Sequence, residues 1–445
     1  MQIVDLEQQL NSFDINTRKS ALTELAELVQ TGKITLPHPK PEVNIHFHTF
    51  FSFNAESWSP SRIVWEAAKY GLEVAGMVDF DVLDGVEEFL DAGELLGIKT
   101  TAGFESRVYV SEYSDKVINS PKEPGILYFM GQGCIKNGSE NPSFGGLRKM
   151  ARDRNIGVIE RINAYLGDVS LDYDRDVLPL TPSGNATERH LLAAYDRKAR
   201  EVHGDNTAKF WAGALEMPEA EVSTLMENTP ALHEKLRAKL IKFGGVGYVQ
   251  PETSSFPAVE QVIEMVKSLG ALPTTAWLDG MNPGEADMMA NLEIMASKGV
   301  VAINIIPDRN WNIKKPEEKA LKLAKLKEVV DAAKHFDLPL SVGTEMNKAG
   351  LPFVDNFAAP ELADYVEDFV KGAQFFYGHT LLARCADFGY FSPAADAAFG
   401  KDRRAKNQFF AKIGSSAKPS PSLYESLRKH AGKLSPEEAL WLVSR

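Results

Sequence analysis

The chain has 445 residues, of which 44% are hydrophobic and 25% charged, and its formal net charge is −12. This composition indicates a globular protein of roughly two or three domains, or one large domain, and the acidic balance argues against an extensive nucleic-acid surface. The two cysteines are too few for a disulfide framework or a thiolate metal site, and neither a secretory signal nor a bilayer-spanning apolar run is evident, which predicts a cytoplasmic protein without a membrane partner.

The first predicted elements are helical. Residues 4–31 carry apolar side chains near the 3.6-residue period and end at Gly32, so we assign residues 1–40 to an N-terminal helical extension. Strands and helices alternate from residue 42 onwards. The expected strands cover residues 42–48, 73–80, 99–110 and 125–132. Helices are expected at 59–71 and 84–97, the first of them with serine caps, Pro60 near its start and Gly71 past its end.

The alternation stops near residue 134 and resumes near residue 255. The residues between are mostly helical, with helical stretches at 144–167, 185–202 and 230–245, so we assign 134–249 to an inserted helical subdomain. Further strands follow at 271–280, 300–307 and 338–347, separated by helices at 257–270, 286–299 and 318–337. About seven strand–helix units with parallel strands predict an α/β barrel of the TIM type, built from 41–133 and 250–350. Residues 351–445 predict a C-terminal helical extension.

Polar side chains recur where the predicted strands end, which is where barrels of this kind carry their chemistry. They are His46, His48, Asp79, Asp81, Glu105, Tyr128, Trp277, Asp279, Asn304, Glu345 and Asn347. His46 and His48 lie two apart on a strand, so both side chains face the same way. Two imidazoles with one or two carboxylates suit Zn²⁺, Mn²⁺ or Fe²⁺.

Each of these residues also has a structural interpretation. His46 and His48 could be histidines satisfied by hydrogen bonds at a barrel mouth. Asp79 and Asp81 could cap the following helix near Asp84, and for Asp81 we favour this interpretation.

The glutamates have structural alternatives as well. Glu105 could pair with Arg107, which shares its strand face, and Glu345 could pair with Lys348 in a loop. The repeated occurrence of imidazoles and carboxylates at one end of several strands favours a joint site, because burying unpaired charges there would be costly.

The order of these motifs resembles the PHP (polymerase and histidinol phosphatase) domain, a superfamily of metal-dependent phosphoesterases. The similar segments are the H-x-H-T-x-x-S start at His46, the S-P-x-x-x-V-x-x-A-x-x-x-G-L helix from Ser59, the D-x-L-D-G-V run from Asp81 and the G-x-E strand at Glu105. The stretch "GNATERHLLAAYDRK" is similar to the helical insert of the nucleotide- and oligonucleotide-phosphatase branch. The resemblance covers roughly residues 42 to 350 and implies a distorted seven-stranded (β/α) barrel of the PHP type.

The resemblance also implies a metal site. The positions that match the family's first metal carry His46, His48, Glu105 and Glu345, the last in place of an aspartate. Histidines that serve the family's other metals are replaced by Phe80, Tyr128, Trp277 and Asn347, and an acidic residue of the opening motif by Phe53 or Asn54. The resemblance therefore implies one divalent metal ion, beside a pocket that has become aromatic.

The implied function is a mononuclear metal-dependent hydrolase that acts on a small phosphorylated or anionic metabolite through metal-activated water. Glu105 would act at the metal, and Asp79 would be the nearest spare carboxylate for proton transfer. The residues proposed to contact the substrate are Arg189 and His190 of an R-x-H-like pair, then Arg161, Arg309, Lys348, Asn347, Trp277 and Tyr128. His379 is expected to be structural.

Two other functions stay open at this stage. One is a non-phosphatase enzyme on the same scaffold, such as a lyase, an isomerase or an amidohydrolase-type C–N hydrolase, because a single metal suffices for such chemistry. The other is a catalytically inactive PHP-like binding protein, because four ligand positions of the family are lost. The oligomeric state is left open.

Overall fold

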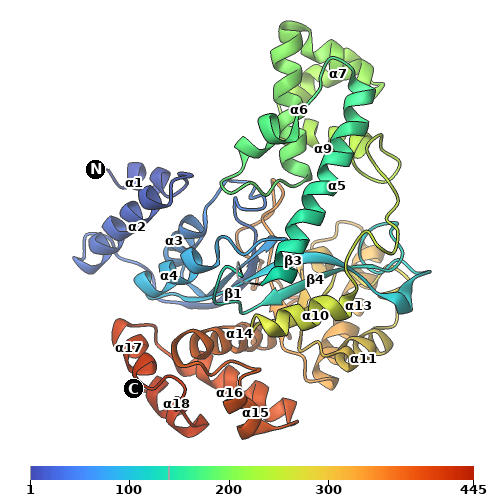
Figure 1. Ribbon diagram of the computed structural model, residues 1–445. Coiled ribbons are helices and arrows are strands. Elements are labelled where there is room, and N and C mark those ends of the chain that lie inside the picture. The colour runs from blue at the N-terminus through green and yellow to red at the C-terminus, as the bar shows by residue number, and fades with distance from the viewer. Residues whose placement is uncertain (1, 139–140) are drawn as a thin grey trace.

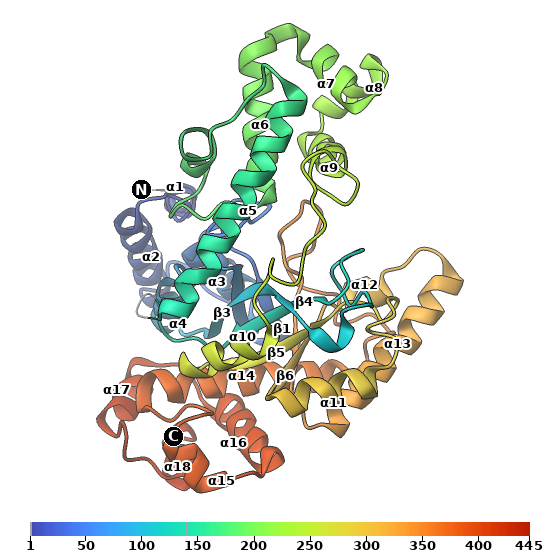
Figure 2. The ribbon, with the colours of Figure 1, turned by 45° about the vertical axis from the view of Figure 1, so that its right-hand side comes forward.

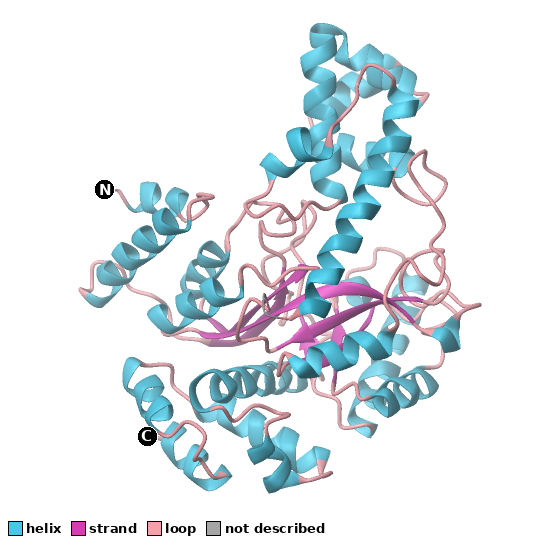
Figure 3. Ribbon diagram, in the orientation of Figure 1, coloured by secondary structure: helices cyan, strands magenta, loops and turns pink. Residues whose placement is uncertain are grey.

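The computed structural model describes residues 2–138 and 141–445. Seven strands form one mixed sheet that curls into a nearly closed barrel, and helices surround it (Figures 1 and 3). In chain order, which is also their order in the sheet, the strands are β1 (Lys40–Phe47), β2 (Leu72–Phe80), β3 (Lys99–Tyr109), β4 (Ile126–Gln132), β5 (Leu272–Trp277), β6 (Ala302–Ile305) and β7 (Leu340–Val342). The predicted α/β barrel is confirmed.

The expectation that all strands run parallel is wrong for β4, which is antiparallel to both β3 and β5. The remaining neighbours are parallel. Parallel neighbours are usually joined through a helix that packs on the sheet, but residues 110–125 between β3 and β4 contain only a 3₁₀ turn, Ser111–Tyr113, and one antiparallel bridge between Val117 and Pro124. The chain therefore reverses there, and β4 begins at the end of the barrel where the other strands finish.

Strands β1 and β7 meet where the barrel closes. The backbone N–H of His48 donates to the carbonyl of Glu345, and the N–H of Glu345 donates to the carbonyl of His46, each over 2.8 Å. Gly343 permits this approach, because a Cβ there would lie 2.5 Å from the Cβ of His46. Residues 343–347 were expected to continue the strand, but Glu345 and Met346 have φ values of 66° and 51°, so the regular strand ends at Val342.

Helices on the outside of the barrel follow the predicted order. They are α3 (Pro60–Tyr70), α4 (Val86–Leu96), α10 (Val259–Ser268), α11 (Met288–Lys298), α12 (Asp308–Trp311) and α13 (Pro316–His335). The predicted caps of α3 are confirmed, since Ser59 accepts a hydrogen bond from the N–H of Arg62 and Gly71 ends the helix at a φ of 82°. Before them come α1 (Ile3–Gln9) and α2 (Ile15–Gln30), packed beside α3 and α4. Among the described residues, no helix is long and apolar enough to cross a membrane.

The segment assigned to the insertion, of which residues 139 and 140 lie outside the described part, builds a helical body above the barrel (Figure 1). Its helices are α5 (Pro142–Leu166), α6 (Glu188–His203), α7 (Thr207–Leu215), α8 (Glu219–Met226) and α9 (Thr229–Leu240). Helix α5 links the two parts. Phe144 and Leu147 in its first turns pack in the barrel's apolar cluster, whereas Ile159 and Ile162 pack in a separate cluster of the insertion.

The C-terminal residues form a helical layer under the barrel. It consists of α14 (Val366–Ala386), α15 (Pro393–Phe399), α16 (Arg403–Ser416), α17 (Pro421–Lys429) and α18 (Pro436–Val443). Helix α14 crosses the ends where the parallel strands begin, with Gly372 packed tightly against Leu340 and Thr380 hydrogen-bonded to Thr101 over 2.9 Å. Because this layer covers the end where the parallel strands begin, the accessible end of the barrel is the one where they finish.

His379 of α14 is structural, as predicted. Its Nε2 bonds to the carbonyl of Gly133 over 3.2 Å, and its Nδ1 accepts the N–H of Tyr390 over 3.0 Å. Burial lowers the pKa of His379 from 6.5 to about 4, against the effect of the Gly133 carbonyl. The imidazole therefore stays neutral in the folded protein at pH values where it would be charged in the unfolded chain.

We predict that stability falls as the pH is lowered from about 6.5 to about 4, because the unfolded chain takes up a proton on His379 first. The contribution reaches up to about 3 kcal/mol. Denaturant midpoints measured across this window should depend less on pH in His379→Gln than in the wild type. His430→Gln, at an exposed position, is the matched control. Equal pH slopes in all three proteins would contradict the prediction.

Candidate metal centre

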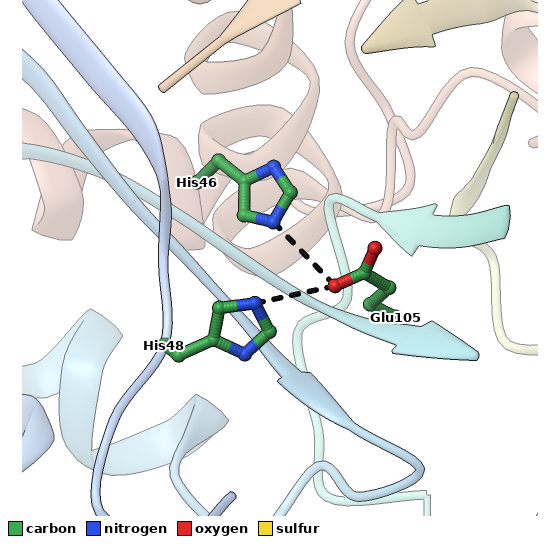
Figure 4. Close-up of side chains that lie close together, drawn as sticks. All are labelled: His46, His48 and Glu105. Atoms are coloured by element: carbon green, nitrogen blue, oxygen red, sulfur yellow. Dashed lines mark ion pairs between the residues drawn. The ribbon is translucent and has the colours of Figure 1, made fainter. Parts of the chain in front are cut away.

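The closest group of potential metal ligands lies inside the open end of the barrel (Figure 4). His46 and His48 stand at the end of β1 and Glu105 on β3, all at most 3% exposed. The Oε2 of Glu105 lies 3.6 Å from the Nε2 of His46 and 3.2 Å from the Nε2 of His48. One ligand atom from each residue falls within 4.8 Å of the other two.

The outer nitrogen of each imidazole is held by a hydrogen bond. The Nδ1 of His46 lies 3.1 Å from the Oδ1 of Asn304, whose own amide donates to Ser341. The Nδ1 of His48 lies 3.2 Å from the Oγ of Ser52. Because Asn304 Oδ1 is an acceptor, and because the Ser52 hydroxyl already donates elsewhere, both rings carry their proton on Nδ1. Both Nε2 lone pairs then face the centre of the group.

Asp79 lies behind His48 and not beside the ligand atoms. Its carboxylate accepts the hydroxyl of Ser52 over 2.6 Å, the hydroxyl of Thr49 over 2.6 Å and the N–H of Thr49 over 2.7 Å. Burial raises the pKa of Asp79, although His48 and these donors oppose the change. A chain of contacts therefore runs from Asp79 through Ser52 to His48, and it orients the imidazole.

Three buried polar atoms in this group have no hydrogen-bond partner among the described residues: the Nε2 atoms of His46 and His48 and the Oε2 of Glu105. An unpaired buried donor or acceptor costs about 1–3 kcal/mol, so three of them pointing at one another need a compensating ligand. Nitrogen and carboxylate oxygen donors in this arrangement fit a divalent cation such as Zn²⁺.

The charged forms of the group are coupled. Burial alone would raise the pKa of Glu105, but the neighbouring imidazoles hold it at about 2. Burial opposes protonation of His46, but Glu105, Glu345 and Asn304 raise its pKa. Glu105 is therefore an ionised carboxylate, which is the form in which a carboxylate binds a metal ion.

The fourth implied ligand, Glu345, is not part of this group. Its Oε2 accepts a hydrogen bond from the Nη2 of Arg309 over 2.9 Å. The charge of Arg309 is therefore already paired with a carboxylate of the protein. The alternative partner considered for Glu345, Lys348, is an exposed loop residue. Glu345 lies near enough to affect His46 electrostatically, so the structure brings three of the four implied ligands together and holds the fourth aside with an arginine.

Two of the replaced ligand positions form an aromatic wall beside the group. Phe80 stacks on His48 with ring centroids 4.5 Å apart, and Tyr128 lies 6.4 Å from Phe80. Trp277 does not belong to this wall. Its neighbour Ala276 packs against Val78 of β2 across the barrel interior, and consecutive strand residues face opposite ways, so Trp277 packs among the outer helices. The expectation that Trp277 contacts the substrate is therefore wrong.

The expected substrate-binding residues of the insertion are engaged with protein groups. Arg161 donates to the carbonyl of Gly247 over 3.0 and 2.9 Å, which fixes the return loop of the insertion. Arg189 pairs with Glu234. His190 caps α6 through the N–H of Thr187 and packs edge-on against Phe53 at 5.5 Å. Asn347 and Lys348 lie in the loop that follows β7.

Two structural interpretations of acidic residues need correction. Asp81 does not cap a helix, because the N-cap of α4 is Gly85 without a side-chain bond; Asp81 accepts the hydroxyl of Ser106 over 2.5 Å instead. Glu105 does not pair with Arg107, whose Nη1 lies 3.1 Å from Glu123. The sequence suggests a partner for Asp81 only in the helix that follows it, whereas its partner in the structure, Ser106, lies on the neighbouring strand.

Several residues that build the site have no role assigned from the sequence. Asn304 is one of the polar residues at the predicted strand ends, and Ser52 with Thr49 belongs to the H-T-x-x-S motif, so these residues carry a usable signal; Asn304 and Ser52 orient the histidines. Asn185 had no such signal. Its side-chain amide donates to the carbonyls of Phe51 and Phe80, over 3.2 and 2.9 Å, and so anchors the insertion beside the barrel mouth.

Comparison with known proteins adds two distant structural likenesses. The chain matches no protein-family model, and no curated protein is significantly similar to it. An amidohydrolase from Chromobacterium violaceum, solved with bound sulfate and no metal, is 14% identical with a TM-score of 0.48, over 73% of this chain and 96% of the other. A Bifidobacterium adolescentis protein described as a metal-dependent phosphoesterase is 17% identical with a TM-score of 0.47, over 75% of this chain and 97% of the other. Values this low do not extend the function of those proteins to this chain.

The first prediction from the site concerns metal content. The wild type should bind Zn²⁺ or Mn²⁺ with one ion per chain. Loss of an outer hydrogen-bond partner of a metal ligand weakens metal binding about 10- to 100-fold. The ligand variants His46→Gln, His48→Gln and Glu105→Gln should each weaken it by more than that. Titration with elemental analysis of the dialysed protein measures this. His38→Gln, at an exposed histidine, should bind like the wild type. Unchanged affinity in all three site variants would contradict the assignment.

The second prediction separates the ligand sets of three and four residues. Because Glu345 is paired with Arg309, Glu345→Gln should weaken metal binding far less than Glu105→Gln does. The same titration, made on both variants in parallel, decides between the sets. Equal losses in the two variants would show that Glu345 leaves Arg309 and joins the metal.

Proposed function

We propose that this protein is a metal-dependent hydrolase with a single divalent ion held by His46, His48 and Glu105, acting on a small phosphorylated or otherwise anionic metabolite. The observation that carries the proposal is the convergence of three buried, unpartnered ligand atoms at the open end of the barrel. Such an arrangement is costly unless a cation compensates it. The resemblance of the sequence to PHP phosphoesterases supports the reaction class.

A divalent ion bound there would supply Lewis-acid activation of water and of a substrate oxygen. The chain's own residues provide the rest. Asn304 and Ser52 hold the imidazoles with Nε2 directed inwards, and Glu105 stays ionised between them. Asp79 already accepts three hydrogen bonds, so it positions His48 through Ser52 and is poorly placed to receive a proton from substrate or water.

The anionic substrate class is supported by Lys348, which lies in the exposed loop after β7 near Glu234 of the insertion. Arg309 and Arg189 are paired with Glu345 and Glu234, so each would bind an anion only by sharing or leaving its carboxylate. A cytoplasmic location remains our proposal, since Cys134 and Cys385 are free buried thiols that suit a reducing compartment.

A non-phosphatase enzyme on the same scaffold is the second candidate. It is favoured by the aromatic wall of Phe80 and Tyr128, which stand at positions where PHP enzymes carry further metal-binding histidines. The described group then has three metal-binding residues. One ion suffices for C–N hydrolysis, lyase or isomerase chemistry. The two candidates therefore share the metal but differ in the bond that is broken.

An activity screen of the metal-loaded protein tests the proposal. Phosphomonoesters, phosphodiesters, and amide or amidine compounds should be offered in parallel, and we expect hydrolysis of an anionic member that chelation abolishes. Glu105→Gln and His48→Gln should lower kcat/KM by at least about a hundredfold, whereas His38→Gln should not. Cleavage of C–N bonds alone would select the second candidate. Metal binding without turnover of any compound would indicate an inactive binding protein.

A further inference from the structure

The barrel mouth carries a pair of arginines that the metal centre does not use. Arg107 lies on β3, two residues beyond Glu105 on the same strand face, and Arg154 comes down from α5 of the insertion. Both guanidinium groups stand over the ring of Phe256, with centroid distances of 4.4 Å for Arg107 and 5.0 Å for Arg154. Figure 2 shows α5, β3 and the loop that descends from α9 to α10, in which Phe256 lies.

Four cations and four carboxylates surround this pair. The cations are Arg107, Arg154, Arg237 and Lys242, and the carboxylates are Asp81, Glu123, Glu188 and Glu105, which acts on Asp81. Arg237 and Lys242 share Glu188, with contacts of 3.0 Å each, and Arg107 has Glu123 at 3.1 Å. Glu105 faces His46 and His48, so among these groups Asp81 is the carboxylate left for Arg154.

Arg154 is the least neutralised of the four cations. Its nearest carboxylate, Asp81, is 3.9 Å away and accepts the Ser106 hydroxyl, while the side chain of Arg154 is 33% exposed. Burial, together with the like charge of Arg107, lowers the pKa of Arg154 to about 10. A guanidinium group that has only one long ion pair and feels the repulsion of a second guanidinium group is stabilised by a bound anion.

We propose that Arg107 and Arg154, stacked on Phe256, form an anion-binding subsite for a second anionic group of the substrate, either a carboxylate or a phosphate. The subsite rests on the proposed function, because the reacting group of the same molecule would lie at the metal centre. Glu105 and Arg107 lie two residues apart on one strand face, so both subsites open on the same end of the barrel. The substrate class is therefore a small metabolite that carries an anionic group besides the group that reacts.

Guanidinium groups suit this task better than ammonium groups. Each presents parallel N–H donors that match two oxygens of a carboxylate or phosphate, and the ring of Phe256 holds both planes in place. Because Arg107 belongs to the barrel and Arg154 to the insertion, a bound anion would also fasten the two parts together.

Binding of small anions to the metal-free protein tests the subsite. Calorimetric titration of the chelator-treated full chain with methylphosphonate and with acetate should detect one of them at about 1 mM or tighter. Arg107→Gln and Arg154→Gln should each weaken that binding by at least about tenfold. Arg152→Gln is the matched control, since Arg152 lies on the same helix but is paired with Asp174 at the surface. The preferred probe identifies the group as a phosphate or a carboxylate.

A measurement on the wild type guards against variants that fail to fold. Phenylglyoxal modification, mapped by mass spectrometry, should be slowed by the bound probe at Arg154 and not at Arg152. The proposal is overturned if neither probe binds, if binding is unchanged in both variants, or if the probe leaves labelling of Arg154 unaltered. Because no metal and no turnover enter these measurements, their failure is distinct from failure of the proposed hydrolase activity.

Discussion

The structure depends on the hydrogen bonds that close β7 onto β1. The two bonds between Glu345 and the backbone of His46 and His48 finish the barrel, and they also fix the segment that carries both histidines. Gly343 is required for the contact, because any side chain there would collide with Asn44 and His46. The left-handed backbone of Glu345 follows from the same closure and turns the chain towards Arg309. Barrel closure and ligand geometry are therefore one constraint.

The single antiparallel strand shapes the mouth of the barrel. Since β4 runs against its neighbours, it starts at the mouth, with Tyr128 near its beginning, and finishes at the opposite end. Helix α5 then runs along the outside of the barrel to reach the insertion. This course of α5 brings Arg154 and Arg107 to the same ring, Phe256. It also places the insertion so that Asn185 donates hydrogen bonds to the backbone carbonyls of Phe51 and Phe80 beside the metal centre. Helix α14 covers the opposite end of the barrel, so the mouth is the accessible end.

Much of the fold was predictable because its signals are local. Alternating apolar patterns, serine caps and glycine stops depend on residues a few positions apart, and α3 with its cap Ser59 and stop Gly71 formed as expected. The reversal of β4 was missed because strand direction depends on how the connection packs, and the sequence of a strand reads alike in both directions. Glu345 was assigned to the metal by its position in a motif, but an arginine distant in the sequence holds it.

By itself, the sequence determined the barrel class, the helical insertion and extensions, and the pairing of His46 with His48 on one strand face, because these follow from side-chain periodicity. The family resemblance already placed Glu105 with them. Only the tertiary structure decided that Glu345 pairs with Arg309 instead, that Asn304 and Ser52 orient the rings, and that Arg107 and Arg154 share the ring of Phe256 across two parts of the chain. The physical reason is that hydrogen bonding, burial and charge compensation act between neighbours in space, and those neighbours are set by strand order and closure.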